Sequence, residues 1–268
     1  MSVISVRVGL NVESLRFLFA VRPDLKRTLT IGRQQLRVSP KKLERLFHVH
    51  HLTVPELGDG FAEPVLRAMG ARTVESLDAS PFEGATLIHD LNHVLGDPPR
   101  RFTSVIDGGT LEHVFHFPNA IRTFMELVEP GGSLVVLVPA NNQNGHGLYQ
   151  FSPELFYRVL EDCFEVDRML LVEYGRRPTW YRVEDPKIAG YRVNVRTRRS
   201  TVLMLHARRT TAEAIPALAP QQSDYEAAWS GARPSPRSLG VKVGDRLARN
   251  VRPLQGRVGA PALRRVKL

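Results

Sequence analysis

The sequence predicts an α/β fold in which helices cover both faces of a mostly parallel sheet of about seven strands. Helical patterns alternate with short apolar runs bounded by Gly, Pro or Asp, which is typical of such sheets. Three consecutive apolar runs lead into Asp78, Asp90 and Asp107. The chain has 268 residues, of which 43% are hydrophobic and 24% charged, an ordinary balance for a folded domain.

The N-terminal part of the chain is expected to begin with a helix over 13–27, interrupted near Pro23 because proline breaks helix interiors. The run from Thr28 to Gly32, TLTIG, predicts a buried strand that ends in a turn. Two helices follow. The first, at 40–47, starts with a serine cap and a proline. The second, at 61–70, is closed by a glycine.

The rest of the pattern predicts further strands at 73–80, 85–92, 103–109, 133–139, 165–174 and 200–207, and helices at 119–128 and 152–162. The Arg- and Tyr-rich segment 178–199 connects the last two strands as a loop or ribbon. The chain then divides into an N-terminal helical segment, an α/β domain and a tail that is partly disordered, with bounds 1–27, 28–209 and 210–268.

The basic charge is concentrated in the tail. Residues 231–268 hold ten of the 37 Lys and Arg residues and one of the 27 acidic residues, so the rest of the chain is nearly neutral. Such a segment could contact an anionic membrane surface, and nucleic acid is a second option. Nucleic acid is the weaker option, because no aromatic residue for base stacking follows Trp229. The default alternative to both is a disordered or loosely packed tail.

The remaining bulk features point to the cytoplasm. The single cysteine, Cys163, excludes an internal disulfide and a multi-cysteine metal site. The N-terminus lacks the basic and then apolar pattern of a signal peptide. No apolar run approaches the ~20 residues of a membrane-spanning helix.

Four predicted strands end in residues suited to ligand binding: Gly32, Asp78, Asp90 and Asp107. In open α/β sheets, ligands bind at the carboxyl ends of the strands, near the point where the strand order reverses. The four residues are therefore expected to line one pocket.

The stretch Val105 to Pro139, VIDGGTLEHVFHFPNAIRTFMELVEPGGSLVVLVP, contains a strand ending in Asp, then LEHV, a helix and PGGSL before another strand. This order and spacing resemble the class I, Rossmann-like S-adenosylmethionine-dependent methyltransferases. The segment HGLYQFSPELFYRVL at 146–160 also matches, and the resemblance covers about residues 28–207. It implies a Rossmann-like sheet, S-adenosyl-L-methionine as cofactor and methyl transfer as the reaction.

The resemblance also implies roles for individual residues. Asp78 would accept both ribose hydroxyls, and Asp90 with Leu91 would lie near the adenine. Asp107, Gly108 and Gly109 would lie beside the methionine moiety and the acceptor. Glycines in such a turn let the backbone approach a ligand closely.

The first strand departs from the family, which expects a G-x-G turn where this chain reads TIGRQQL. Gly32 is kept, but Arg33 and Gln34 stand where small residues usually leave space. Either one of these two side chains folds over the cofactor and contacts its carboxylate, or the site is damaged.

Three residues are candidates for catalysis. Methyl transfer depends mainly on positioning, but a base that accepts a hydroxyl proton can add ~10²–10⁴-fold. Glu112 and His113 follow the strand tip at Asp107, and His146 lies in a polar, Gly-rich loop. The alternative roles are structural: Glu112 favouring a helix start, His113 lining the acceptor pocket, and His146 in a self-satisfied turn.

No metal site is expected. The histidines of HVHH at 48–51 and the pair His113 and His116 have no HExxH or similar motif around them. The sequence therefore predicts a cytoplasmic methyltransferase that methylates oxygen on a small-molecule or glycan-type acceptor. Two alternatives stay open: a non-catalytic binding or scaffold protein with a degenerate turn, and a nucleic-acid methyltransferase that uses the basic tail.

Overall fold

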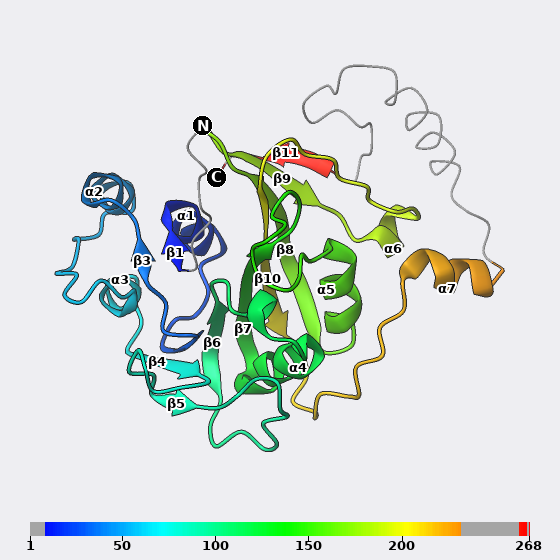
Figure 1. Cartoon of the computed structure of the whole chain (residues 1–268), viewed down its shortest axis with the longest axis horizontal. Coiled ribbons are helices and arrows are strands. Elements are labelled where there is room, and N and C mark those ends of the chain that lie inside the picture. Colours follow the sequence, from blue (N-terminus) through cyan, green and yellow to red (C-terminus); the bar gives the residue numbers. More distant parts are fainter. Residues whose placement is uncertain (1–8, 232–262, 267) are drawn as a thin grey trace.

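The computed structural model describes residues 9–231, 263–266 and 268, and these residues build two β-sheets (Figure 1). The large sheet has nine strands in the order β11-β9-β8-β10-β7-β6-β2-β4-β5. A small parallel sheet pairs β1 with β3. The strands are β1 Leu10–Asn11, β2 Arg27–Ile31, β3 Leu36–Arg37, β4 Thr73–Asp78, β5 Leu87–Ile88, β6 Phe102–Asp107, β7 Val128–Pro139, β8 Phe164–Glu173, β9 Thr179–Val183, β10 Thr201–Arg209 and β11 Leu263–Val266.

The large sheet is parallel where the predicted site lies. From β5 to β7 every neighbouring pair of strands is parallel. β10 is antiparallel to both β7 and β8, and β9 and the edge strand β11 add further antiparallel pairs. The expected α/β sheet with a parallel central part is confirmed, whereas the strand count is nine rather than about seven and the sheet is mixed.

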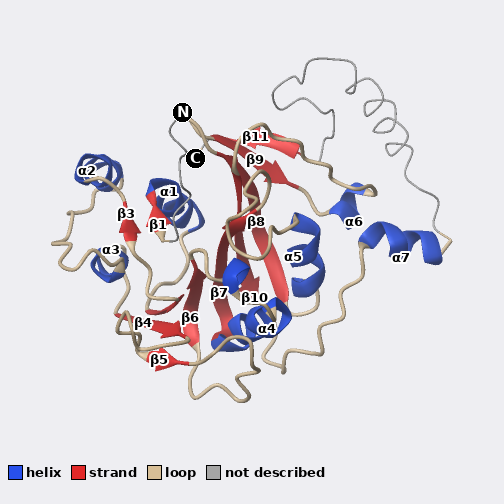
Figure 2. Ribbon diagram, in the orientation of Figure 1, coloured by secondary structure: helices blue, strands red, loops and turns tan. Residues whose placement is uncertain are grey.

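Helices cover both faces of the sheet, as Figure 2 shows. Successive residues of a strand point to opposite faces, so Val105 packs into one apolar core and Ile106 into the other. The first core is shared with α4 and α5, and the second with α1, α2 and α3. The helices are α1 Val12–Val21, α2 Pro40–Val49, α3 Glu63–Ala68, the 3-10 helix η1 Leu111–His113, α4 Phe117–Leu127, α5 Pro153–Leu160, α6 Pro186–Ala189 and α7 Ser223–Trp229.

Two predicted elements are shorter in the structure. The entry helix expected over 13–27 ends at Val21, where Arg22 adopts a left-handed conformation just before the proline. The strand expected over 85–92 is reduced to Leu87–Ile88, because the side chain of Asp90 binds Asn92 and turns the chain. Asp90 therefore lies beyond the end of β5.

The segment predicted as a loop or ribbon, 178–199, contains strand β9 and helix α6. Within the predicted tail, α7 forms a short helix and β11 pairs with β9 in antiparallel register. Most of the basic segment 231–268, with its expected membrane contact, lies outside the described residues. Among the described residues, no helix combines the length and the apolar character needed to cross a membrane.

Candidate functional site

The order in which the chain adds strands to the sheet reverses between β2 and β6. It runs outward from β2 through β4 to β5 and then returns to place β6 on the other side of β2. The carboxyl ends of β2, β4 and β6 bring Gly32, Asp78 and Asp107 to one edge of the sheet. This is the position at which open α/β sheets bind ligands.

The turn after β2 is tight and requires glycine. Gly32 has a φ of +69°, and a Cβ there would lie 2.9 Å from the hydroxyl oxygen of Thr110 and 3.9 Å from Oδ2 of Asp78. Asp78 is half-buried, and no hydrogen bond or ion pair within the described residues engages its carboxylate. An acceptor group that faces a glycine turn and has no protein partner is free to bind a ligand.

Gln34 fills part of this edge. Its side chain is 3% exposed and its amide nitrogen donates to the carbonyl oxygen of Ile31, whereas its buried amide oxygen has no hydrogen-bond partner in the part of the chain that the structure describes. That oxygen lies 2.3 Å from the position of a Cβ on Gly108. The space above Gly108 is therefore occupied by Gln34.

Arg33 points elsewhere. Its guanidinium binds Asp59 and Glu63, both at 2.7 Å, donates to the carbonyl oxygen of Glu83 and stacks on the ring of Phe61 at 3.9 Å. The hydrogen bond with Glu63 is the main cause of a raised pKa for Arg33. Of the two residues that replace the expected small ones, only Gln34 lies at the strand tips.

Asp107 organises the turn that follows β6. It is fully buried; Oδ1 accepts from the backbone N–H groups of Gly109 and Thr110, and Oδ2 accepts from that of Leu111. Burial, and then the negative charge of Glu112, raise the pKa of Asp107 to about 7. Its carboxylate holds the turn and is not directed at a ligand.

Asp90 lies in an exposed turn, two residues beyond Ile88, which pairs with Asp78. Its carboxylate accepts two hydrogen bonds from Asn92, and the backbone N–H of Asn92 is the main cause of its lowered pKa. The neighbouring Leu91 is buried in the apolar core. The structure thus places Asp78 and Asp107 at the tips of the two strands that flank β2, and leaves Asp90 on the rim, engaged by Asn92.

The three predicted catalytic residues form one cluster. Nε2 of His146 lies 3.4 Å from Oε1 of Glu112, and Nε2 of His113 lies 3.9 Å from the same oxygen. Glu112 is buried, His146 is partly buried and His113 is exposed. The hydrogen bond to Glu112 raises the pKa of His146 above its ordinary value. The cluster can accept a proton or hold a cation.

A small cavity of about 30 Å³ joins the cluster to the strand tips. Gly108 and Gly109 line it from β6, Pro139 from β7, and Glu112 and His146 from the cluster. The segment after Gly9 closes it, together with Tyr174, whose hydroxyl accepts a hydrogen bond from Asn11. Sequence reasoning missed this N-terminal cover, since nothing in the pattern of residues 9–14 indicates where the segment packs.

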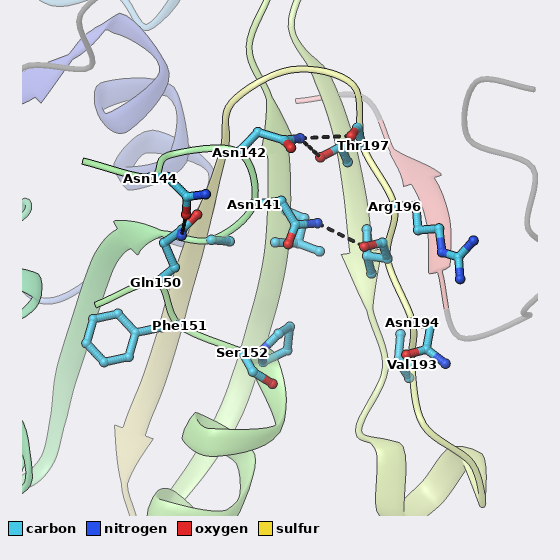
Figure 3. Close-up of a pocket in the computed structure, with 14 residues that line it drawn as sticks. Asn141, Asn142, Asn144, Gln150, Phe151, Ser152, Val193, Asn194, Arg196 and Thr197 are labelled. Atoms are coloured by element: carbon cyan, nitrogen blue, oxygen red, sulfur yellow. Dashed lines mark hydrogen bonds between the residues drawn. The ribbon is translucent and has the colours of Figure 1, made fainter. Parts of the chain in front are cut away.

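A second, larger hollow of about 700 Å³ lies between the loop after β7 and the segment before β10 (Figure 3). Its walls are rich in amide side chains, namely Asn141, Asn142, Asn144, Gln150 and Asn194. Hydrogen bonds tie the two walls together, from Asn141 to the carbonyl oxygen of Val195 and from Asn142 to Thr197. Sequence reasoning missed this hollow, although the asparagines in PANNQNG were visible as a polar loop.

The strand order and the position of these residues define a Rossmann-like α/β protein with its ligand edge at the reversal point between β2 and β6. No family model and no curated protein matches the chain.

Several solved structures similar to this chain are methyltransferases, the family that the sequence resembles. The N-methyltransferase NodS from Bradyrhizobium japonicum is 11% identical, with 75% of this chain and 94% of that chain covered at a TM-score of 0.40. An S-adenosylmethionine-dependent methyltransferase from Mesorhizobium loti is 15% identical, with 74% and 98% covered at 0.43. A 1,6-didemethyltoxoflavin-N1-methyltransferase from Burkholderia thailandensis is 14% identical, with 75% and 77% covered at 0.40. Because these values are low, the functional argument rests on the residues of this chain.

Proposed function

We propose that this chain is an S-adenosylmethionine-dependent methyltransferase that methylates a hydroxyl of a small-molecule or glycan-type acceptor. The observation that carries the proposal is the carboxylate of Asp78, which no other described residue engages, beside the Gly32 turn at the reversal point of the sheet. A carboxylate offers two acceptor oxygens, which suit the two hydroxyls of a ribose. Because residue 32 is a glycine, it adds no side chain of its own to the space beside that carboxylate.

Gln34 is the residue that must adjust to a cofactor. Its side chain lies over Gly108, where the methionine part of the cofactor is expected. The buried amide oxygen of Gln34 has no hydrogen-bond partner among the described residues, and such an unsatisfied group costs ~1–3 kcal/mol. Turning the side chain away relieves that cost, so the residues present fit the cofactor once Gln34 moves.

When bound, the cofactor supplies a methyl group on a positively charged sulfur. The chain contributes the position of the acceptor and a route for its proton. The cavity beside Gly109 opens on Glu112 and His146. An acceptor hydroxyl held there passes its proton to the imidazole of His146, and the buried carboxylate of Glu112 stabilises the resulting cation.

The amide-lined hollow supports a hydroxylated acceptor. Its lining includes Asn144 and Gln150, which flank His146 in the same loop. Amide groups donate and accept hydrogen bonds, as does a hydroxyl group, and they add no net charge. These amides already hydrogen-bond within the wall, and their remaining donor and acceptor positions match a molecule rich in hydroxyls, which favours oxygen as the methylated atom.

Titration calorimetry with S-adenosylhomocysteine tests the proposal. We expect binding at submillimolar concentration and a loss of at least about tenfold in Asp78→Asn, because one acceptor oxygen is replaced by a donor. Asp162→Asn, an exposed change elsewhere, is the matched control. Absence of binding to the unmodified chain would refute the proposal, and binding without methyl transfer across hydroxylated acceptors would favour the non-catalytic alternative.

A further inference from the structure

Glu112, His113 and His146 place three potential ligand atoms within 4.8 Å of one another. Two of them belong to the turn after β6, and the third comes from the loop after β7. Two histidines and one glutamate are a donor set that zinc enzymes use, with the fourth position left open for water or substrate. We propose that these three side chains bind one divalent transition-metal ion, for which Zn²⁺ is the best match.

The distances between the donor atoms suit such an ion. Metal–ligand bonds of about 2.0–2.2 Å at tetrahedral angles separate the ligand atoms by about 3.3–3.5 Å. The distance from Oε1 of Glu112 is 3.4 Å to Nε2 of His146 and 3.9 Å to Nε2 of His113. All three ligand atoms lie within 4.8 Å of one another, so closure needs a shift of the order of an ångström or less, and His113 is the exposed member that can move.

Two buried oxygens without partners provide a second, independent observation. Oε2 of Glu112 and Oε1 of Gln143 are both buried without a hydrogen bond in the described residues, and both side chains line the small cavity beside the cluster. A buried acceptor without a partner is costly. An ion held by Glu112 would satisfy the carboxylate oxygen. A water or a substrate hydroxyl in the cavity would donate a hydrogen bond to Gln143, since about 30 Å³ is enough room for a water.

The local charge favours a cation. The carboxyl groups of Asp107 and Glu112 are both buried in the same turn after β6. A divalent ion would offset this concentration of negative charge. The scaffold is also rigid: the backbone N–H of Leu148 donates to the carbonyl oxygen of Glu112 at 2.7 Å, and Gly147 packs directly on the Glu112 side chain.

The inference departs from the sequence-based expectation of no metal, and its link to chemistry rests on the proposed function. The open position of the ion would face the cavity and polarise an acceptor hydroxyl there. With the ion bound, His146 would hold the metal and would not act as the base. The ion would lower the pKa of the acceptor hydroxyl, and the proton would pass to a solvent water.

The test uses the full chain stripped with a chelator and titrated with Co²⁺, whose visible absorption reports its ligands, followed by competition with Zn²⁺. We expect one ion per chain and an affinity at least about tenfold weaker in His146→Ala and His113→Ala. His116→Ala is the matched control, since it removes an exposed histidine of the same LEHVFH stretch. Circular dichroism of each variant confirms folding.

Equal affinity in all four proteins, or no saturable binding in the unmodified chain, would overturn the metal site. Binding of S-adenosylhomocysteine is measured on the same samples. Retained binding of that compound without metal binding would reject the metal site and leave the proposed methyltransferase function standing.

Discussion

The amide oxygen of Gln34 occupies the space that a side chain on Gly108 would need, at 2.3 Å from the Cβ position. The turns that follow β2 and β6 thus meet through one flexible side chain and one glycine. Whether Gln34 can leave decides whether a cofactor reaches the strand tips. A substitution at Gly108 tests how easily the Gln34 side chain moves.

Gly108→Ala is expected to lower the free energy of unfolding by less than Gly132→Ala. The new methyl group at 108 meets mainly the end of a flexible side chain, whereas at 132 it meets the backbone oxygens of Glu129 and Thr103 at 2.9 and 3.0 Å. We expect about 1 kcal/mol for the first and about 2–3 kcal/mol for the second by denaturant unfolding. An equal or larger cost at 108 would mean that Gln34 is locked in place.

The buried carboxyl of Asp107 is expected to make stability depend on pH. Its pKa is about 7 in the folded chain and near 3.9 in an unfolded one, so between these values the folded state binds more protons. The free energy of unfolding therefore falls as pH rises through this window. Relative to Asp107→Asn, the unmodified chain should lose on the order of 1–3 kcal/mol between pH 5 and pH 8.

The comparison with Asp107→Asn isolates this carboxyl from other titrating groups, because asparagine keeps one acceptor oxygen for the turn but does not ionise in this range. Urea unfolding of both proteins at the two pH values gives the difference. The prediction is contradicted if the unmodified chain loses no stability relative to Asp107→Asn between pH 5 and pH 8, or gains stability. Either result would show that Asp107 is already ionised at low pH in the folded chain.

Arg158 is expected to be the most costly charged residue to remove. Its guanidinium is 2% exposed, binds both oxygens of Asp185 at 2.5 Å and pairs with Glu161. Removing it empties a buried site and leaves the partly buried carboxylate of Asp185 without its partner, so Arg158→Ala should lower the free energy of unfolding by ~3 kcal/mol. Arg208→Ala breaks an exposed pair and should cost no more than ~1 kcal/mol. Similar costs for the two changes in thermal unfolding would contradict this ranking.

Gly147→Ala is expected to damage the cluster of Glu112, His113 and His146 specifically. A Cβ at 147 would lie 2.8 Å from Cγ of Glu112 and 2.9 Å from its carbonyl oxygen. Gly145→Ala is the matched control, because it also has a positive φ but no atom within 4 Å of the new carbon. Co²⁺ affinity should fall by about 10–100-fold in the first variant and remain close to that of the unmodified chain in the second. Equal losses would attribute the effect to backbone strain.

The parts of the fold that depend on local pattern could be predicted from the sequence. The strands that lead into Asp78 and Asp107 are present, and Ser152 caps α5 by accepting from the backbone N–H of Glu154. The strand through 85–92 could not be predicted correctly, because a side-chain turn at Asp90 competes with the sheet for the backbone. The pairing of β11 with β9 brings distant segments together and has no local signal.

The candidate site was predictable only in part for the same reason. The residues Glu112, His113 and His146 could be named from their positions after two strands, but their contact depends on how the two loops pack. A search for metal motifs within one helix misses them, since the third ligand comes from a different loop. The Gln34 side chain lies over Gly108 because the glycine has no side chain there. This contact joins the turns after two different strands, so the local sequence around Gln34 does not reveal it.

The pairing of β11 with β9 affects how the basic C-terminal region should be studied. Truncation at residue 231 would remove the partner of β9 and leave its backbone N–H and C=O groups open to association with other chains. Aggregation of such a truncated protein could then be mistaken for loss of a binding partner. Replacing arginines between 233 and 257 with glutamine would change the charge while keeping this strand pair intact.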